Sequence, residues 1–177
     1  MTTSYGKVAI GAEGRSVRFE RHFDASPEEV WAALTDPEQV RVWLLAEATF
    51  ELEVGGGVTF DWGEQGECSG TVSLCDPPHV LEYSWIEKAG TSIARFELRP
   101  AEVGGVLLIL DHRELPASAH AGVGAGWHAH LEALAALLAS RPFEFWPRFH
   151  ELEPHYEKVV ADLGAPTDVS RSERRAG

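Results

Sequence analysis

The chain has 177 residues, of which 44% are hydrophobic, 24% charged and 10% aromatic. This length suits one domain, and the composition supports a packed core and excludes a wholly disordered chain. Fifteen basic residues against 28 acidic ones give a net charge of −13 with neutral histidines. Such an acidic surface repels phosphate backbones and anionic lipids, so we expect neither nucleic acid nor a membrane as partner. The first residues lack a basic head followed by an apolar stretch, and we expect a cytoplasmic protein.

The first predicted elements are one strand and two short helices. Residues 16–24 alternate between apolar and polar side chains, which is the period of a half-buried strand. Residues 26–29 (SPEE) combine a capping hydroxyl, a proline at the first helical position and a glutamate at the third, which is typical of a helix start. Residues 36–38 (DPE) repeat this signal and predict a second short helix, with Trp43 facing inward. Residues 1–15 are expected to form an amino-terminal extension.

Six further strands are predicted between residues 48 and 112. Apolar and polar side chains alternate in each, and turns rich in glycine or proline separate them. Connections this short join antiparallel neighbours, so the expected sheet is antiparallel and has seven strands in all. The six segments are residues 50–54, 58–62, 70–75, 80–86, 93–98 and 106–112.

The carboxyl-terminal part of the chain is predicted to be helical. Residues 127–140 place apolar side chains at i, i+4, i+7 and i+11, the pattern of a long amphipathic helix. A helical appendage is expected at residues 141–164, and it begins with the aromatic stretch 143–149. That stretch is too apolar for a free linker, so we expect it to pack on its own domain, with a homodimer contact as the alternative. Residues 165–177 are expected to be a disordered tail.

These elements predict an α+β domain over residues 16–140. A seven-stranded antiparallel sheet cannot leave its apolar face in water, and residues 127–140 form the one long helix available to cover it. The sheet is therefore expected to curve around that helix, with the two short helices closing one end. Such a shape seldom fills its interior completely, so we expect a concave apolar pocket between sheet and helix.

The motifs along residues 16–140 resemble those of a known family. The longest is SPEEVWAALTDPE at residues 26–38, and shorter matches follow in the same order. The chain resembles the bacterial AHSA-type family, which is named after the activator of the 90-kDa heat-shock-protein ATPase and belongs to the START-like (SRPBCC) superfamily. This resemblance implies the helix-grip fold. The shorter matches are Trp43 and Leu44, residues 54–56, 70–72, 76–78, 81–85, 96–98 and 108–110 with His112, and Gly126 and Trp127 with Leu131 and Leu134.

The functions implied by this resemblance are diverse. Superfamily members include lipid carriers, hormone-binding proteins and polyketide aromatases or cyclases, and the fold alone does not choose among them. The eukaryotic activators carry a further amino-terminal domain that does much of the chaperone binding, and we expect no counterpart before residue 16. Interaction with a chaperone ATPase is therefore the third hypothesis, after ligand binding and catalysis.

Strand phase places one set of side chains on the sheet face that meets the long helix. A lining of rings with a few polar tips is how proteins usually orient apolar ligands. The alternative is that the same side chains are plain core. The predicted ligand-binding residues are Trp43, Phe60, Trp62, Leu81, Tyr83, Trp85, Phe96, Leu98, Leu108, Leu110, His112, Trp127, His130 and Leu131.

Catalysis would require a titratable group inside this cavity. His112, at the end of an inward-facing strand, is the best catalytic candidate for a cyclase or hydratase, assisted by Tyr83 or His130.

Cys68 and Cys75 are seven positions apart on one predicted strand, which puts them on opposite faces, so no disulfide is expected. Metal and cofactor motifs are missing from the sequence. The leading hypothesis is non-enzymatic binding of a small hydrophobic or aromatic ligand, without metal or cofactor.

Overall fold

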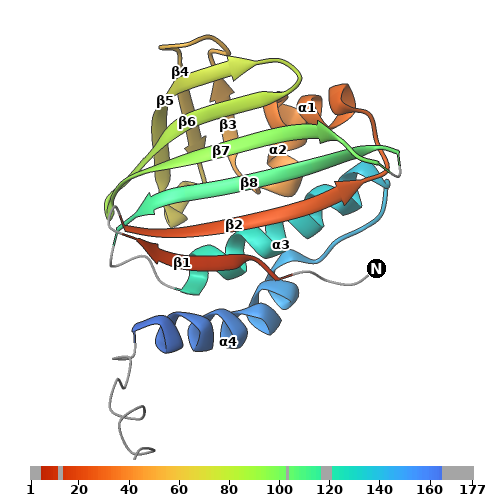
Figure 1. Cartoon of the computed structure of the whole chain (residues 1–177). Helices are drawn as coiled ribbons and strands as arrows, with labels where there is room; N and C mark the ends of the chain where they lie inside the picture. The colour runs from red at the N-terminus through yellow and green to blue at the C-terminus, as the bar shows by residue number, and fades with distance from the viewer. Residues whose placement is uncertain (1–4, 12–13, 103, 117–120, 165–177) are drawn as a thin grey trace, which may run out of the picture.

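The protein folds as one curved sheet that holds its helices on the concave side (Figure 1). The structure is a computed structural model that describes residues 5–11, 14–102, 104–116 and 121–164, so the tail predicted at residues 165–177 lies outside it. Within the described residues, eight strands form the sheet in the order β1-β2-β8-β7-β6-β5-β4-β3, and neighbouring strands are antiparallel. The elements are β1 (Lys7–Gly11), β2 (Gly14–Phe23), α1 (Pro27–Thr35), α2 (Pro37–Trp43), β3 (Glu47–Phe50), β4 (Gly57–Asp61), η1 (Gly63–Gln65), β5 (Glu67–Asp76), β6 (Val80–Glu87), β7 (Gly90–Pro100), β8 (Val106–Leu115), α3 (Ala121–Leu138) and α4 (Phe145–Gly164).

The two short helices begin where the sequence predicts. Ser26 Oγ accepts a hydrogen bond from the Glu29 N–H (3.2 Å), and the Glu29 carboxylate accepts one from the Ser26 N–H (2.8 Å), which completes a capping box. Asp36 caps α2 by accepting from a backbone N–H at 3.0 Å. The indole of Trp43 is 2% exposed and donates to the Ala33 carbonyl (2.8 Å). This buried bond ties α2 to α1.

The sheet has one strand more than the sequence predicts. β1 lies within the expected amino-terminal extension and pairs with β2 so that Val8 faces Val17. Gly14, the first residue of β2, has a φ of +117°, a conformation that favours glycine. The five residues of β1, KVAIG, do not alternate between apolar and polar, so period-two patterning does not reveal the strand.

β3 also ends earlier than predicted. The strand expected over residues 50–54 is Glu47–Phe50, which pairs with β4. Leu52 and Val54, which extended the predicted pattern, are 39% and 67% exposed because they lie in the connection that leaves the sheet. Alternation in the sequence therefore continues past the last paired residue.

Helix α3 begins six residues before its predicted start. Its first two turns contain Gly122, Gly124 and Gly126, which the sequence suggests are part of a loop. At Gly124, a Cβ atom would lie 2.4 Å from the ring of Tyr156 in α4. The absence of a side chain at this position therefore permits close packing of two helices.

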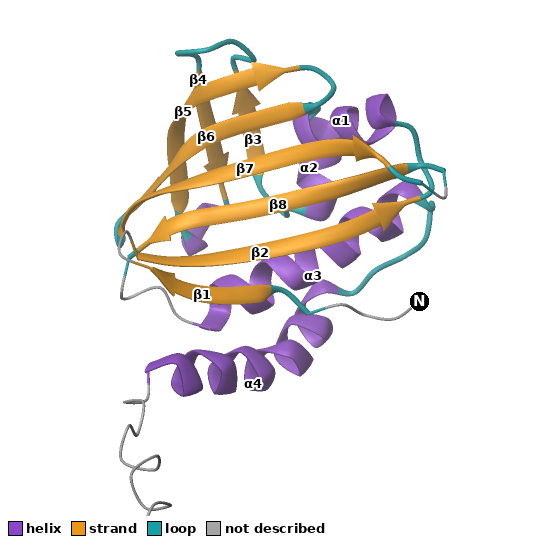
Figure 2. Ribbon diagram, viewed as in Figure 1, coloured by secondary structure: helices purple, strands orange, loops and turns teal. Residues whose placement is uncertain are grey.

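Helix α4 packs on its own domain, as predicted for the aromatic stretch. Figure 2 shows it running along α3 near the β1 edge of the sheet. The ring of Phe145 stacks on His130 of α3 at a centroid distance of 4.3 Å, and Tyr156 is fully buried. Arg148 of α4 donates two hydrogen bonds, of 2.6 and 3.0 Å, to the Glu132 carboxylate of α3. None of the described helices is long and apolar enough to cross a membrane.

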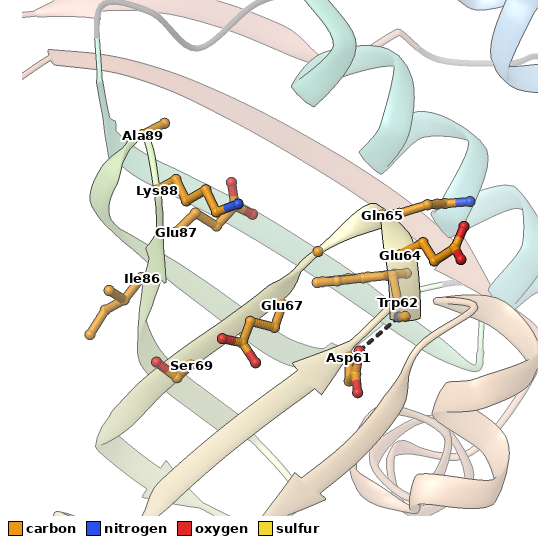
Figure 3. Close-up of a pocket in the computed structure, with 12 residues that line it drawn as sticks. Asp61, Trp62, Glu64, Gln65, Glu67, Ser69, Ile86, Glu87, Lys88 and Ala89 are labelled. Carbon is orange, nitrogen blue, oxygen red and sulfur yellow. Dashed lines mark hydrogen bonds between the residues drawn. The ribbon is translucent and has the colours of Figure 1, made fainter.

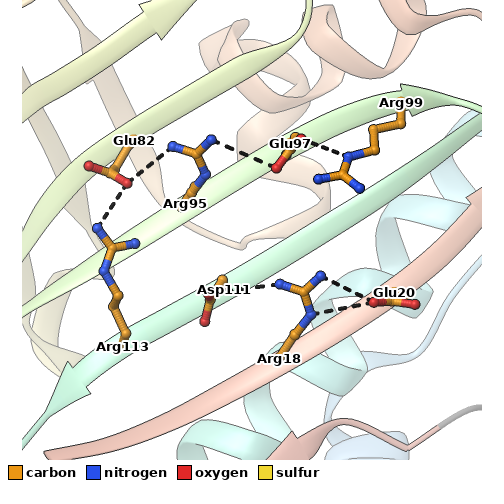
Figure 4. A network of polar contacts seen from close by, with 8 residues as sticks. All are labelled: Arg18, Glu20, Glu82, Arg95, Glu97, Arg99, Asp111 and Arg113. Atoms are coloured by element: carbon orange, nitrogen blue, oxygen red, sulfur yellow. Dashed lines mark hydrogen bonds and ion pairs between the residues drawn. The ribbon is translucent and has the colours of Figure 1, made fainter.

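The convex face of the sheet carries paired charges (Figure 4). Glu82 accepts hydrogen bonds from Arg113 (3.0 Å) and Arg95 (3.4 Å), and Glu97 accepts one from Arg99 (2.7 Å). Four arginines and four carboxylates meet here, so this network adds nothing to the net charge of −13. The acidic excess therefore lies on other surfaces. The network consists of Arg18, Glu20, Glu82, Arg95, Glu97, Arg99, Asp111 and Arg113.

Candidate ligand-binding site

A small hollow lies at the end of the curved sheet where α3 begins. Its volume is about 140 Å³, and three indole rings and two imidazole rings line it. We call it the aromatic pocket. Its side chains come from β6, β8, α3 and the residues that follow α2 and β4. They are Leu44, Trp62, Trp85, Glu87, His112, Val123, Trp127 and His130.

Two further hollows adjoin the aromatic pocket. A side pocket of about 280 Å³ shares Trp85, Glu87, His112 and Val123 with it and continues between the start of β7 and the start of α3. A larger outer groove of about 730 Å³ shares Trp62 and Glu87 with the aromatic pocket and runs between η1 and the end of β6 (Figure 3). The outer groove therefore borders the aromatic pocket at Trp62 and Glu87.

Trp85 is the central ring of the site. Its centroid lies 5.5 Å from that of Trp127, 5.6 Å from that of His112 and 5.9 Å from that of Trp62. These separations fall in the range of favourable contacts between rings. The rings therefore support one another as a preformed wall.

His112 is held between two residues by both of its ring nitrogens. The indole N–H of Trp127 donates to Nδ1 (2.8 Å), and Nε2 lies 2.8 Å from the Ser92 hydroxyl. Because an indole nitrogen can only donate, Nδ1 is the unprotonated nitrogen, and Nε2–H donates to Ser92. The Ser92 hydroxyl in turn donates to the Trp85 carbonyl (3.4 Å). All polar atoms of this imidazole are therefore satisfied inside the protein.

This arrangement does not support His112 as a general base. Burial lowers the pKa of His112 to about 4, so the ring is neutral at neutral pH, but Trp127 occupies the lone pair that would accept a proton. Tyr83, its expected assistant, is 3% exposed and does not line any of the three hollows. Burial also raises the pKa of Tyr83 far above its ordinary value. His112 instead forms part of the wall and fixes the Trp127 ring.

His130 has one nitrogen without a partner among the described residues. Its Nδ1 lies 2.8 Å from the Trp43 carbonyl. Because a carbonyl oxygen can only accept, Nδ1 carries the proton and Nε2 keeps its lone pair. Burial lowers the pKa of His130 to about 4, so this acceptor is present at neutral pH. His130 is therefore a lining residue with an unused hydrogen-bond acceptor.

The predicted ligand-binding residues fall into two groups. Five of the fourteen line the aromatic pocket, namely Trp62, Trp85, His112, Trp127 and His130. The other nine line none of the three hollows and are between 0% and 3% exposed in the hydrophobic core. The positions of these nine residues agree with the alternative interpretation, in which the side chains on this face belong to the hydrophobic core. They are Trp43, Phe60, Leu81, Tyr83, Phe96, Leu98, Leu108, Leu110 and Leu131.

Three lining residues are absent from the predicted set. Glu87 has the same strand phase as Trp85, so alternation indicates that it faces inward, but a charged side chain does not fit the pattern of an apolar wall. Val123 lies in the segment predicted to be a loop. Leu44 follows α2, and only the shared fold brings it to the site.

A second polar cluster joins α3 to α4 and to the chain before β1. The Gly6 N–H donates to the Tyr156 hydroxyl (2.9 Å), and the same hydroxyl lies 2.9 Å from His128 Nδ1. His128 Nε2 lies 3.3 Å from the Glu132 carboxylate. Although burial opposes ionisation, contacts from His128 and Arg148 lower the pKa of Glu132 to about 2. Since these groups bind one another, the cluster is a structural connection between elements.

The described residues offer no other obvious centre for chemistry. They contain no group of three or more histidine, cysteine, aspartate or glutamate side chains that could hold a metal ion. Cys68 and Cys75 are both free, and burial raises the pKa of Cys68 to about 12. A thiol with that pKa is a poor nucleophile at neutral pH.

Comparison with known proteins places the chain in a family. Residues 24–139 match the family described as "Activator of Hsp90 ATPase homolog 1-like protein". The chain belongs to this family. The membership confirms the resemblance that the sequence motifs carry. No curated protein matches the chain in sequence.

Solved structures agree with the START-like fold of this Hsp90 ATPase activator-like protein. CalU16 from Micromonospora echinospora is 27% identical, with a TM-score of 0.69 over 90% of this chain and 98% of that one. The protein encoded by BPP1335 from Bordetella parapertussis is 30% identical, with a TM-score of 0.67 over 89% and 93%. EF2215 from Enterococcus faecalis, a conserved protein of unknown function, is 21% identical, with a TM-score of 0.76 over 90% and 92%, and shows the shared fold alone. The predicted α+β class and curved antiparallel sheet are confirmed, with eight strands in place of seven.

Proposed function

We propose that the protein binds a small planar apolar molecule, one or two rings in size, in the aromatic pocket and releases it chemically unchanged. The observation that carries this proposal is the ring of three indoles and two imidazoles around a hollow of about 140 Å³. An engineered protein cavity of about 150 Å³ binds benzene, so this volume suits a single aromatic ring. The adjoining side pocket gives space for a second ring.

Burial of ring surface supplies the binding free energy. A two-ring molecule that buries roughly 200 Å² of apolar surface gains about 5 kcal/mol at about 25 cal/mol per Å². Ring-to-ring contacts add on the order of 1 kcal/mol, and lost freedom of motion opposes both gains. Because the gain of about 6 kcal/mol is an upper bound, we expect a dissociation constant between about 40 µM and 1 mM.

Two alternatives are less well supported by the geometry. A cyclase- or hydratase-like reaction at His112 would first require breaking its bond to Trp127. A chaperone-cofactor role would use an outer surface, and the charges on the convex face are already paired with one another. That pairing weakens the face as an electrostatic docking surface.

A substitution that fills the hollow tests the proposal. Val123 is half-buried and lines both the aromatic and side pockets, so Val123→Phe places a ring in the space for the ligand. Val42→Phe adds the same ring at a position of α2 that is 56% exposed, and it serves as the control. Native mass spectrometry would measure retained small molecules and the binding of added naphthalene-sized compounds. The same spectra report whether the protein forms a homodimer.

We expect the wild type and Val42→Phe to bind these compounds equally and Val123→Phe to bind them at least tenfold more weakly. Equal binding by all three proteins would place the ligand elsewhere and contradict the proposal. A wild type that binds none of the compounds would also contradict it.

A further inference from the structure

The hydrogen bonds within the aromatic pocket determine what polar groups it can offer to a ligand. All three of its indole N–H groups donate to acceptors within the protein. A donor already used in this way is not available to a ligand without loss of an internal bond. The bonds are Trp62 to the Leu44 carbonyl (3.0 Å), Trp127 to His112 Nδ1 (2.8 Å) and Trp85 to the Glu87 carboxylate.

The two imidazoles provide no free donor either. His112 gives its Nε2–H to Ser92, and His130 gives its Nδ1–H to the Trp43 carbonyl. Among the eight residues that line the pocket, no side-chain N–H therefore remains unused.

Two acceptors remain available. One is Nε2 of His130, to which no described residue is bonded. The other is Oε2 of Glu87, whose Oε1 accepts from Trp85. The side chains that line this pocket therefore carry unpaired acceptors and no unpaired N–H donor.

We infer that the pocket selects planar aromatic ligands that carry a hydroxyl or amino hydrogen and rejects the same rings when they carry a carboxylate. This inference rests on the proposed function and names its ligand class. A hydroxyl on the ligand donates to His130 Nε2, whereas a methoxy group in its place leaves that acceptor unpaired. A carboxylate would also lie near the Glu87 charge, and no described lysine or arginine lines the pocket to offset it.

The approach to the pocket supports the same selection. The outer groove is lined by Asp61, Glu64, Glu67 and Glu87, and Lys88 is the single cation among its lining residues (Figure 3). Anions entering along this path are repelled, and neutral or cationic molecules are not. The groove therefore disfavours anions, as the Glu87 carboxylate does within the pocket.

Three compounds with one ring system separate these contributions. They are 2-naphthol, which can donate; 2-methoxynaphthalene, which cannot; and 2-naphthoate, which is an anion at pH 7. The indole N–H signals of Trp62, Trp85 and Trp127 in ¹H–¹⁵N spectra report binding at the pocket directly. We expect 2-naphthol to bind about five- to tenfold more tightly than 2-methoxynaphthalene, and 2-naphthoate to bind most weakly.

Two variants assign the selection to residues. In His130→Asn, the amide nitrogen can replace Nδ1 as donor to the Trp43 carbonyl, but no atom replaces Nε2. We expect the preference for 2-naphthol over 2-methoxynaphthalene to fall below twofold in this variant. His79→Asn is the control, because its side chain is 57% exposed and outside the three hollows, and it should keep the wild-type preference.

Glu87→Gln keeps an acceptor for Trp85 and removes the charge, so 2-naphthoate should bind it several-fold more tightly than it binds the wild type.

The outcomes separate this inference from the proposed function. If all three compounds bind the wild type equally, or if 2-naphthoate binds most tightly, the function stands and the inferred ligand class is wrong. A preference for 2-naphthol that persists in His130→Asn would also overturn the inference. If none of the compounds changes the three indole signals, the proposed function fails, and the inference fails with it.

Discussion

His112 and His130 line the same hollow and serve different purposes because of their hydrogen-bond partners. His112 accepts from Trp127 and donates to Ser92, so its tautomer and orientation are fixed. His130 donates to a backbone carbonyl, and its Nε2 has no partner among the described residues. Burial lowers the pKa of both imidazoles to about 4. They therefore contribute neutral, oriented groups to the pocket.

These lowered pKa values make stability depend on pH. Unfolded histidine has a pKa near 6.5, so below that pH the unfolded chain binds protons that the folded protein does not accept until about pH 4. The free energy of unfolding should therefore decrease as the pH falls from 6.5 to 4.5. Each of the two histidines should account for about 2 kcal/mol of this decrease. Urea unfolding at several pH values measures it.

Substitution of His112 isolates its share of the pH dependence. His112→Asn keeps an acceptor for the Trp127 indole and removes the titrating group, so its decrease should be smaller than that of the wild type by about 2 kcal/mol. His79→Asn makes the same change on the surface, where the side chain is 57% exposed, and serves as the control variant. Equal decreases in wild type and His112→Asn would show that the buried imidazole titrates normally.

Helix α3 is packed on two sides, and its residue pattern reflects both. One side carries Trp127 and His130 at the aromatic pocket, and another carries Gly124 against Tyr156 of α4. Glycine weakens a helix by about 1 kcal/mol relative to alanine, so its presence here needs a compensating contact. The close approach of the Tyr156 ring provides that contact.

Two glycine substitutions in α3 should have opposite effects. In Gly124→Ala the new Cβ would lie 2.4 Å from Tyr156, so we expect a loss of about 1–3 kcal/mol in the free energy of unfolding despite the better helix propensity. In Gly122→Ala nothing lies within 4 Å of the new Cβ, so we expect no loss and a gain of up to about 1 kcal/mol. Thermal or urea unfolding distinguishes them. If both variants are stabilised, the proposed close packing of α3 and α4 is wrong.

The sequence predicts elements well where local chemistry determines them. The caps at Ser26 and Asp36 mark both short helices, because capping depends on residues three positions apart or fewer. The start of α3 is not predicted, because Gly124 packs against Tyr156 of α4, which is distant from it in the chain. Likewise, strand phase identifies inward residues such as Leu110 and Trp85 but not which of them borders a hollow. Whether an inward residue borders a hollow depends on how closely each end of the curved sheet packs against α3.

The whole molecule is a curved sheet that is filled at one end and hollow at the other. Leu108, Leu110 and Leu131 are fully buried, whereas the hollows gather around the start of α3. Charge is distributed unevenly as well, because the convex network is balanced and the outer groove is acidic. This distribution combines an apolar site with an approach that disfavours anions.

A crystal structure of the protein with 2-naphthol is the most direct measurement of where the ligand binds. We expect the naphthalene rings in the aromatic pocket, packed against Trp85 and Trp127, with the hydroxyl oxygen within hydrogen-bond distance of His130 Nε2. Ligand density only at another surface, or ordered water filling the aromatic pocket in the presence of saturating 2-naphthol, would contradict the account.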